Sequence, residues 1–150
     1  MISFFVQGTP APQGSKRFVG IHQGKGRMIE SSKKVKPWRE AVYWAAIEAK
    51  QKAGMVEPMD EPINAVMIFA LPKPSSVKRL WPDRKPDLDK LVRSTSDALV
   101  NAGIIADDAR IVKCHAVKIY VGKVYDGLCG PILFSTPGAS IILETMGEKA

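Results

Sequence analysis

The sequence predicts a single small domain of the α/β (or α+β) class, in which a mixed β-sheet carries two main helices. Apolar segments with strand-like and helix-like spacing follow one another in the order strand, helix, strand, helix, strand, strand. A length of 150 residues and a hydrophobic content of 45% suit one domain that buries its own core. Two cysteines are too few for a scaffold held together by disulfides.

The N-terminal half is expected to hold one strand, one basic segment and one helix. The sequence ISFFVQ, from Ile2 to Gln7, favours a strand because it is apolar and is followed by turn-forming glycine and prolines. Residues 13–31 are rich in glycine and basic residues and have no apolar period, which favours a flexible basic loop or a loose hairpin. Residues 36–53 have one apolar face at helical spacing and end before Gly54, so we expect a helix.

The second half is expected to hold three strands and one helix. Ile63 to Leu71 is uniformly apolar, which indicates a central strand. Residues 72–86 contain four prolines and are expected to form a connection. Residues 87–102 have the spacing of an amphipathic helix, and residues 110–121 and 139–144 are predicted strands.

Targeting features are absent from the sequence as given. No apolar run approaches the 18 residues needed to span a membrane, and the first residues lack the basic and apolar regions of a signal peptide. We therefore expect a cytoplasmic protein with Cys114 and Cys129 reduced, and Cys114 is expected to be buried on its strand.

The positive charge is concentrated in one segment. The chain has a formal net charge of +7. Residues 16–39 contain eight bases and one acid, so the remaining chain is neutral. Such a segment is typical of proteins that bind a polyanion, most often nucleic acid, although a solvated basic loop that aids solubility has the same composition. The side chains expected to contact DNA here are Lys16, Arg17, Lys25, Arg27, Lys33 and Lys34.

Four aspartates flank the second predicted helix. Asp87 and Asp89 open it, and Asp107 and Asp108 precede the next strand. If the chain turns after the helix, residues 104–108 can cover at most roughly 17 Å of the way back, so convergence within one subunit is tight. A two-fold dimer would relax this constraint.

Carboxylates gathered on a nucleic-acid-binding protein indicate a divalent cation. Mg²⁺ prefers hard oxygen ligands and is usually bound by one or two carboxylates, water and substrate phosphate. The bound ion would polarise the scissile phosphate and activate water. Two simpler interpretations stay open: Asp87 and Asp89 as a helix cap and a first-turn acid, and Asp107 and Asp108 as an acidic turn.

Arg93 is the basic side chain best placed to act with these acids. It lies four residues after Asp89, so the two share a helix face. It serves either as a fixed cation for the transition-state phosphate or as the partner in an ordinary ion pair. Asp97 continues the same face and is expected to pair with Arg93.

The run PDLDKLVRSTSDAL, followed by NAGIIADDARIV and a strand that contains Lys118, resembles the RusA-like crossover (Holliday) junction endodeoxyribonucleases. The similarity is strongest from Arg84 to Tyr120. The family pattern has Asn after the D-x-D motif and Lys at the place of Arg93, whereas this sequence has Lys90 and Arg93. Arginine keeps the charge but lacks the compact ammonium group of lysine.

The resemblance implies a RusA-like fold and a Mg²⁺-dependent homodimer, with Mn²⁺ able to replace Mg²⁺, that nicks four-way DNA junctions symmetrically. It places the protein in DNA recombination and repair, in a prophage setting. It assigns catalysis to Asp87, Asp89, Asp108 and Arg93, and metal binding to Asp87, Asp89, Asp107 and Asp108. It also adds DNA contacts by Lys85, Lys90 and Lys118, although Lys118 could equally be a solvent-facing strand residue.

Two other functions remain compatible with the sequence. One is a catalytically weak or inactive DNA- or RNA-binding module of the same fold, in which the acids act as caps and ion pairs and Arg93 marks lost activity. The other is a small hydrolase that acts on a nucleotide or phosphoester.

Overall fold

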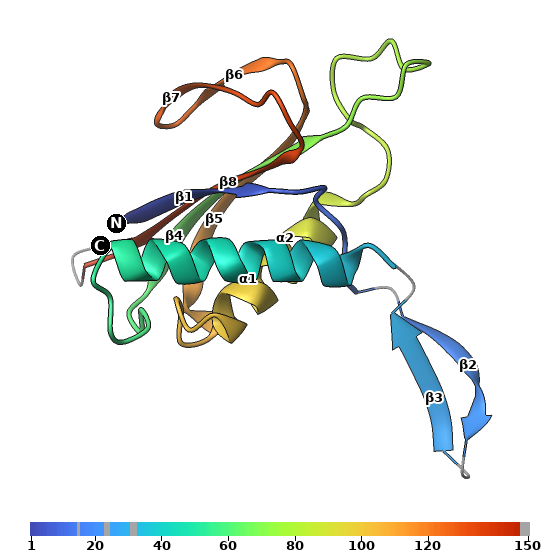
Figure 1. Cartoon of the computed structure of the whole chain (residues 1–150), viewed down its shortest axis with the longest axis horizontal. Coiled ribbons are helices and arrows are strands. Elements are labelled where there is room, and N and C mark those ends of the chain that lie inside the picture. Colours follow the sequence, from blue (N-terminus) through green and yellow to red (C-terminus); the bar gives the residue numbers. More distant parts are fainter. Residues whose placement is uncertain (15, 23–24, 31–32, 148–150) are drawn as a thin grey trace.

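The computed structural model describes residues 1–14, 16–22, 25–30 and 33–147, and for residues 16–19, 22 and 25–30 it describes only the backbone. A four-stranded sheet lies at its centre, with two helices on one face and a small β-hairpin on the other (Figure 1). The sheet has the strand order β1-β8-β4-β5, with β1 at Ile2–Gln7, β8 at Gly138–Thr145, β4 at Ile63–Leu71 and β5 at Ile111–Tyr120.

The sheet is mixed, as predicted, because β4 pairs antiparallel with β8 and parallel with β5. Every residue of β4 except Asn64 is buried, so a uniformly apolar strand occupies the inner position that its composition predicts. The link from β4 to β5 passes through α2 (Leu88–Asn101), which makes this unit a β-α-β crossover. The start of α2 and the start of β5 are therefore at opposite ends of the sheet.

The main core lies between the sheet and the two helices. Trp38 and Val42 of α1 (Val35–Lys52) and Leu91 and Leu99 of α2 are buried against the β4 side chains on this face, such as Phe69. The indole Nε1 of Trp38 donates a buried hydrogen bond to Oγ1 of Thr95 at 3.1 Å, which ties α1 to α2. Both helices match their predicted positions to within one residue at each end.

A second, smaller core covers the opposite face. Val66 and Ile68 of β4 pack with Phe134 beneath a hairpin formed by β6 (Val124–Gly127) and β7 (Gly130–Leu133). The sequence interpretation did not include this hairpin, because each strand has only four residues. Strands this short carry too little alternation to stand out from the surrounding Gly, Asp and Pro.

The basic segment is also a hairpin. The backbone of β2 (Lys16–His22) pairs antiparallel with that of β3 (Lys25–Glu30), which is the second of the two predicted forms, and the pair projects away from the sheet (Figure 1). No helix within the described ranges is both long and apolar enough to cross a membrane.

Cys114 is exposed, so its predicted burial is wrong. The reason is that β5 lies at the edge of the sheet and α2 covers only part of it. The sulfur is nevertheless partly desolvated, which raises the pKa of the Cys114 thiol above its ordinary value.

Candidate functional site

The first pair of predicted acids lies at the N-terminal end of α2. Asp87 occupies the N-cap position, yet its carboxylate makes no capping hydrogen bond, and Oδ2 instead lies 3.1 Å from Nζ of Lys90. Asp89 is exposed in the first turn and has no ion pair or hydrogen bond to any other described side chain. The simpler interpretation of Asp87 as a side-chain cap therefore does not hold. The helix macrodipole favours negative charge at both positions.

Lys118 fixes the segment that precedes these acids. Its Nζ donates to the carbonyl oxygens of Arg84 at 2.7 Å and of Pro86 at 2.8 Å. Lys118 is opposite Phe69 in the β4–β5 register, so it lies on the helix face of the sheet, below the start of α2. It is therefore not the solvent-facing residue of the simpler interpretation. Two of its three donors hold backbone, and a phosphate contact would have to use the third.

The chain segment that leads into the basic hairpin runs along the same half of α2. Oγ of Ser94 donates to the carbonyl oxygen of Ala11 at 2.6 Å, and the backbone N–H of Gln13 donates to the carbonyl oxygen of Lys90 at 3.0 Å. A Cβ on Gly14 would lie only 3.1 Å from a guanidinium nitrogen of Arg93. These contacts hold residues 11–14, which lead toward β2, against the first half of α2.

The ion pairs predicted along α2 do not form. Arg93 makes no salt bridge with Asp89 or Asp97, and its guanidinium lies against the backbone of Gly14. Asp97 instead accepts a hydrogen bond from the side-chain amide of Gln13, which comes from outside the helix. The prediction that Asp97 pairs with Arg93 is therefore wrong, because a distant segment of the chain occupies that carboxylate.

The second pair of acids follows α2 at its other end. Asp107 precedes the short 3-10 helix η1 (Asp108–Arg110), and its Oδ1 accepts from the backbone N–H of Ala109 at 2.7 Å. Asp108 is exposed at the start of η1. Nε of Arg110 lies 2.8 Å from Oδ1 of Asp60. For Asp107 the structure agrees with the simpler interpretation, an acidic turn closed by its own side chain.

One subunit does not bring the two pairs together. The 14 residues of α2 span about 20 Å between them. Residues 104–106 do not run back along α2, because they pair with Met59: its N–H donates to the carbonyl oxygen of Ile104, and the N–H of Ala106 donates to its carbonyl oxygen. Among the described residues no group of three or more His, Cys, Asp or Glu side chains is placed to hold a metal ion. Of the two possibilities that the sequence leaves open, convergence of the acids within one subunit is not seen among the described residues.

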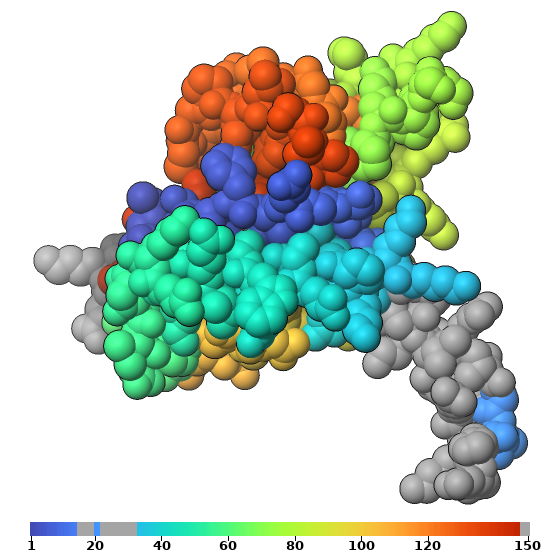
Figure 2. Space-filling view, viewed as in Figure 1, coloured from blue at the N-terminus to red at the C-terminus, as the bar shows by residue number. Residues whose placement is uncertain are grey.

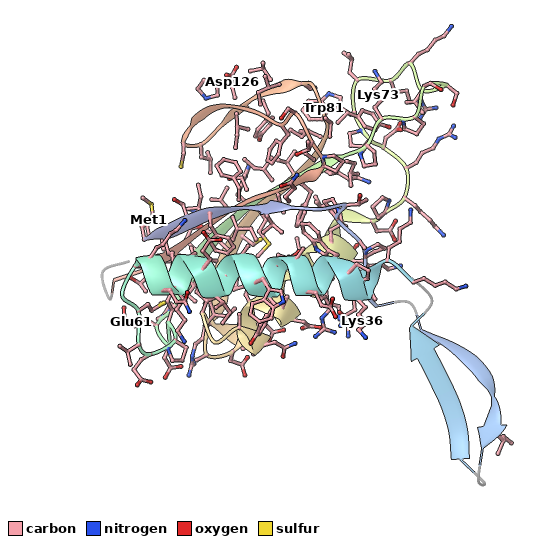
Figure 3. The ribbon with its side chains drawn as sticks, in the orientation of Figure 1. Met1, Lys36, Glu61, Lys73, Trp81 and Asp126 are labelled. Carbon is pink, nitrogen blue, oxygen red and sulfur yellow. The ribbon has the colours of Figure 1, made fainter. Side chains whose placement is uncertain are left out.

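A second basic surface, which sequence reasoning missed, flanks the first pair of acids. The connection at 72–86 carries five bases and one acid. It also exposes Leu80 (70%) and Trp81 (47%), and the Nζ of Lys123 lies 3.3 Å from the centroid of the Trp81 ring. Figure 3 shows Lys73 and Trp81 on this connection, above the sheet. The bases of this loop are visible in the sequence. They were missed because the net charge was summed over all residues outside 16–39, and that sum is zero. The bases of this loop are Lys73, Lys78, Arg79, Arg84 and Lys85.

The predicted DNA contacts divide into three groups. The side chains of Lys16, Arg17, Lys25 and Arg27 lie outside the part that the structure describes. Lys33 and Lys34 are exposed just before α1. Lys85, Lys90 and Lys118 surround the start of α2. In the space-filling view, the 72–86 loop and the start of α1 extend from the same side of the molecule (Figure 2).

The donor set at the start of α2 fits a hydrated divalent cation. Two carboxylates, that of Asp89 exposed and that of Asp87 partly exposed, have no capping role and leave oxygen ligands available, and Mg²⁺ completes its octahedron with water and phosphate. The basic side chains around Asp87 and Asp89 favour the binding of a phosphate group together with the ion.

A comparison with known proteins identifies a related family. A family model described as endodeoxyribonuclease RusA matches residues 7–126. The match includes both pairs of acids, the hairpin β2–β3, the 72–86 loop and Lys118. No curated protein matches the chain.

Proposed function

The chain belongs to the RusA family of endodeoxyribonucleases, and from this premise we propose that it is a Mg²⁺-dependent homodimeric enzyme that cuts four-way DNA junctions by symmetric nicking. The proposal includes Mn²⁺ as a substitute ion, a cytoplasmic location, and a role in DNA recombination and repair, in a prophage setting.

The observation that carries the proposal is the pair of accessible aspartates at the start of α2, next to the basic 72–86 loop and to residues 11–14, which lead toward the hairpin β2–β3. Asp87 makes no capping bond and Asp89 has no partner among the described side chains. A side-chain cap would engage Asp87 with backbone N–H groups, and an i,i+4 ion pair would engage Asp89 with Arg93, but neither contact is present. Their availability supports a role toward a ligand.

The side chains around the start of α2 have separable roles in this proposal. Asp87 and Asp89 would hold the ion, which when bound supplies a Lewis acid for the scissile phosphate and lowers the pKa of an attacking water. Arg93, on the next turn, neutralises phosphate charge as it develops. Because guanidinium stays protonated, we assign it to charge stabilisation and not to proton donation.

Lys118 and the segment around Gly14 position these groups. Lys118 holds the backbone at residues 84 and 86, directly before Asp87. Gln13 and Gly14 hold the helix on its other side, beside Lys90 and Arg93. These contacts fix the position of the aspartates relative to the sheet and to the segment that leads toward the basic hairpin. DNA bound by the bases would therefore lie close to the aspartates.

The two basic surfaces are expected to bind the phosphates of the DNA arms. Binding of several phosphates releases counterions, which supplies affinity independent of sequence. Selectivity for a junction then depends on whether DNA arms can reach both surfaces at once, so we assign it to shape.

A cleavage assay tests the proposal. Labelled synthetic four-way junctions and linear duplexes of the same sequence are incubated with Mg²⁺ and either the wild type or Asp89→Asn. We expect the wild type to nick the junction selectively and the variant to lose this activity while it still binds. Tight binding without cutting in Mg²⁺ or Mn²⁺ would favour a binding module instead. Turnover of small phosphoesters with weak, salt-insensitive DNA binding would favour a small hydrolase.

A further inference from the structure

Arg93 lies between two acids on one face of α2. Asp89 is four residues before it and Asp97 is four residues after it, a spacing that leaves about 5–6 Å between Cβ atoms. Both carboxylates are within reach of the guanidinium, and an ion pair with either one is the ordinary arrangement on such a helix face. Neither pair forms among the described residues, so other contacts determine where the guanidinium lies.

The side chain of Gln13 occupies the second of these acids. Its Nε2 donates to Oδ2 of Asp97, and its backbone N–H donates to the carbonyl oxygen of Lys90 at 3.0 Å. The two contacted residues are seven positions apart on α2, so Gln13 spans about two helical turns, including the turn of Arg93. The carboxylate that follows Arg93 is therefore engaged by a neutral donor in place of a cation.

Gly14 borders the guanidinium of Arg93 near the start of the helix. A Cβ on Gly14 would lie 3.1 Å from Nη1 of Arg93 and 3.7 Å from Cγ of Lys90, which is about one turn earlier. Gly14 has a φ of +130°, a backbone conformation that favours glycine. Side chains on a helix lean toward its N-terminus, and this contact holds the guanidinium beside the turn that contains Lys90.

The contact between Gln13 and Asp97 is not the most stable arrangement that these side chains offer. Oε1 of Gln13 is buried and has no hydrogen-bond partner among the described residues. A buried acceptor without a partner lowers stability, whereas a pair between Arg93 and Asp97 would satisfy this acid without burying the amide. The arrangement therefore indicates a purpose other than stability, and the side chain that it leaves out of an ion pair is Arg93.

We propose that Gln13 is a positioning residue that, by occupying Asp97, keeps Arg93 out of an ion pair and directs its guanidinium to substrate phosphate at the start of α2. The inference rests on the proposed function, in which Arg93 neutralises phosphate charge. An arginine already paired with a carboxylate would have to break that pair before it could meet the phosphate. A guanidinium that is held in place but not neutralised is preorganised for the charge that develops during cleavage.

Rescue of one variant by a second change tests this role. Gln13→Met keeps the side-chain volume but removes the donor, so Asp97 can capture Arg93, and we expect the kcat for junction cleavage to fall about tenfold with a much smaller change in Kd. Gln13→Met/Asp97→Asn removes the capturing charge, so kcat is expected to return to within about threefold of the wild type. Asp97→Asn alone keeps an acceptor for Gln13 and should cut at the wild-type rate. Gln51→Met, at an exposed glutamine near the end of α1, is the matched control and should do the same.

The double variant separates this role from a merely structural one. If the hydrogen bond of Gln13 only supported the fold, removing the charge of Asp97 as well would leave cleavage as slow as in Gln13→Met or slower. That result would overturn the inference, as would cleavage by Gln13→Met at the wild-type rate. Circular dichroism checks that the variants are folded.

A crystal structure of Gln13→Met gives a readout that does not depend on activity. We expect a guanidinium nitrogen of Arg93 within about 4 Å of a carboxylate oxygen of Asp97, the usual limit for a salt bridge. A guanidinium that stays beside Gly14, with Asp97 unpaired, would overturn the inference. A wild type that fails to cut junctions would contradict the proposed function, and the structure of the variant would still decide whether Gln13 keeps Arg93 and Asp97 apart.

Discussion

The two ends of α2 carry similar acidic patterns but treat them differently. At the start, the carboxylates of Asp87 and Asp89 are left out of the capping hydrogen bonds and are surrounded by bases. At the end, Asp107 caps a 3-10 turn through the N–H of Ala109, and the neighbouring Arg110 is paired with Asp60. Asp87 and Asp89 are thus distinguished from Asp107 by whether the surrounding backbone already uses their carboxylate oxygens.

The largest expected effect comes from removing a charge at the start of the helix. Asp89→Asn is expected to lower the kcat for junction cleavage by about a hundredfold or more, because the ion loses a charged ligand. Single-turnover cleavage at saturating protein measures this directly. Asp126→Asn, an exposed aspartate on β6, is the matched control and should cut at the wild-type rate. Equal cleavage by Asp89→Asn and the wild type would show that the start of α2 has no special role in catalysis.

The second effect concerns how the start of the helix is held. Lys118→Met removes the donors to the carbonyl oxygens at 84 and 86 and is expected to lower kcat about tenfold, with the Kd for junction DNA changed far less. Lys113→Met, on the exposed part of the same strand, is the control. A change in Kd with an unaltered kcat would instead assign Lys118 to phosphate binding.

The third effect concerns the bases that flank the start of the helix. Lys78→Ala/Lys85→Ala is expected to reduce the salt dependence of junction binding by about two phosphate contacts, each worth roughly 0.9 in the slope of log K against log salt. Titrations at several salt concentrations measure the slope. Lys52→Ala, which removes a base at the far end of α1, should leave the slope unchanged. An unchanged slope in the double variant would show that Lys78 and Lys85 do not contact DNA phosphates.

The smallest effect is expected at the other end of α2. Asp107→Ala removes the acceptor for the Ala109 N–H and is expected to lower the free energy of unfolding by about 1 kcal/mol. Cleavage should stay within about threefold of the wild-type rate, because this carboxylate already has a structural role. Denaturant unfolding and the cleavage assay together check both statements. A loss of cleavage as large as that of Asp89→Asn would show that Asp107 binds the ion despite its cap.

Local signals predicted most of the fold. The position of β4 followed from its uninterrupted apolar composition, and α1 and α2 ended where glycines and a change of periodicity placed their ends. The hairpin β6–β7 was missed because its strands are short, and the exposure of Cys114 was missed because alternation does not show whether a strand lies inside a sheet or at its edge.

The sequence indicates which residues form the candidate site, but it does not indicate how far apart they lie. The D-x-D motif and the two acids before β5 were visible in the sequence, and the family match covers them. Their distance depends on the path of residues 104–106, which pair with Met59 instead of returning along α2. Likewise, Asp97 binds the side chain of Gln13, a partner 84 positions away that helix periodicity does not indicate. In both cases, contacts between segments that are distant in sequence determine where the carboxylates lie and what they bind.

The central claim is that Asp87 and Asp89, at the start of α2, hold a divalent ion. A crystal of the wild-type protein soaked in Mn²⁺ tests it through anomalous scattering. We expect an ion bound by Asp87 and Asp89, with ligand distances near those of hard divalent cations, about 2.0–2.2 Å. Anomalous density that is absent at Asp87 and Asp89, or that lies only at other side chains, would contradict the account.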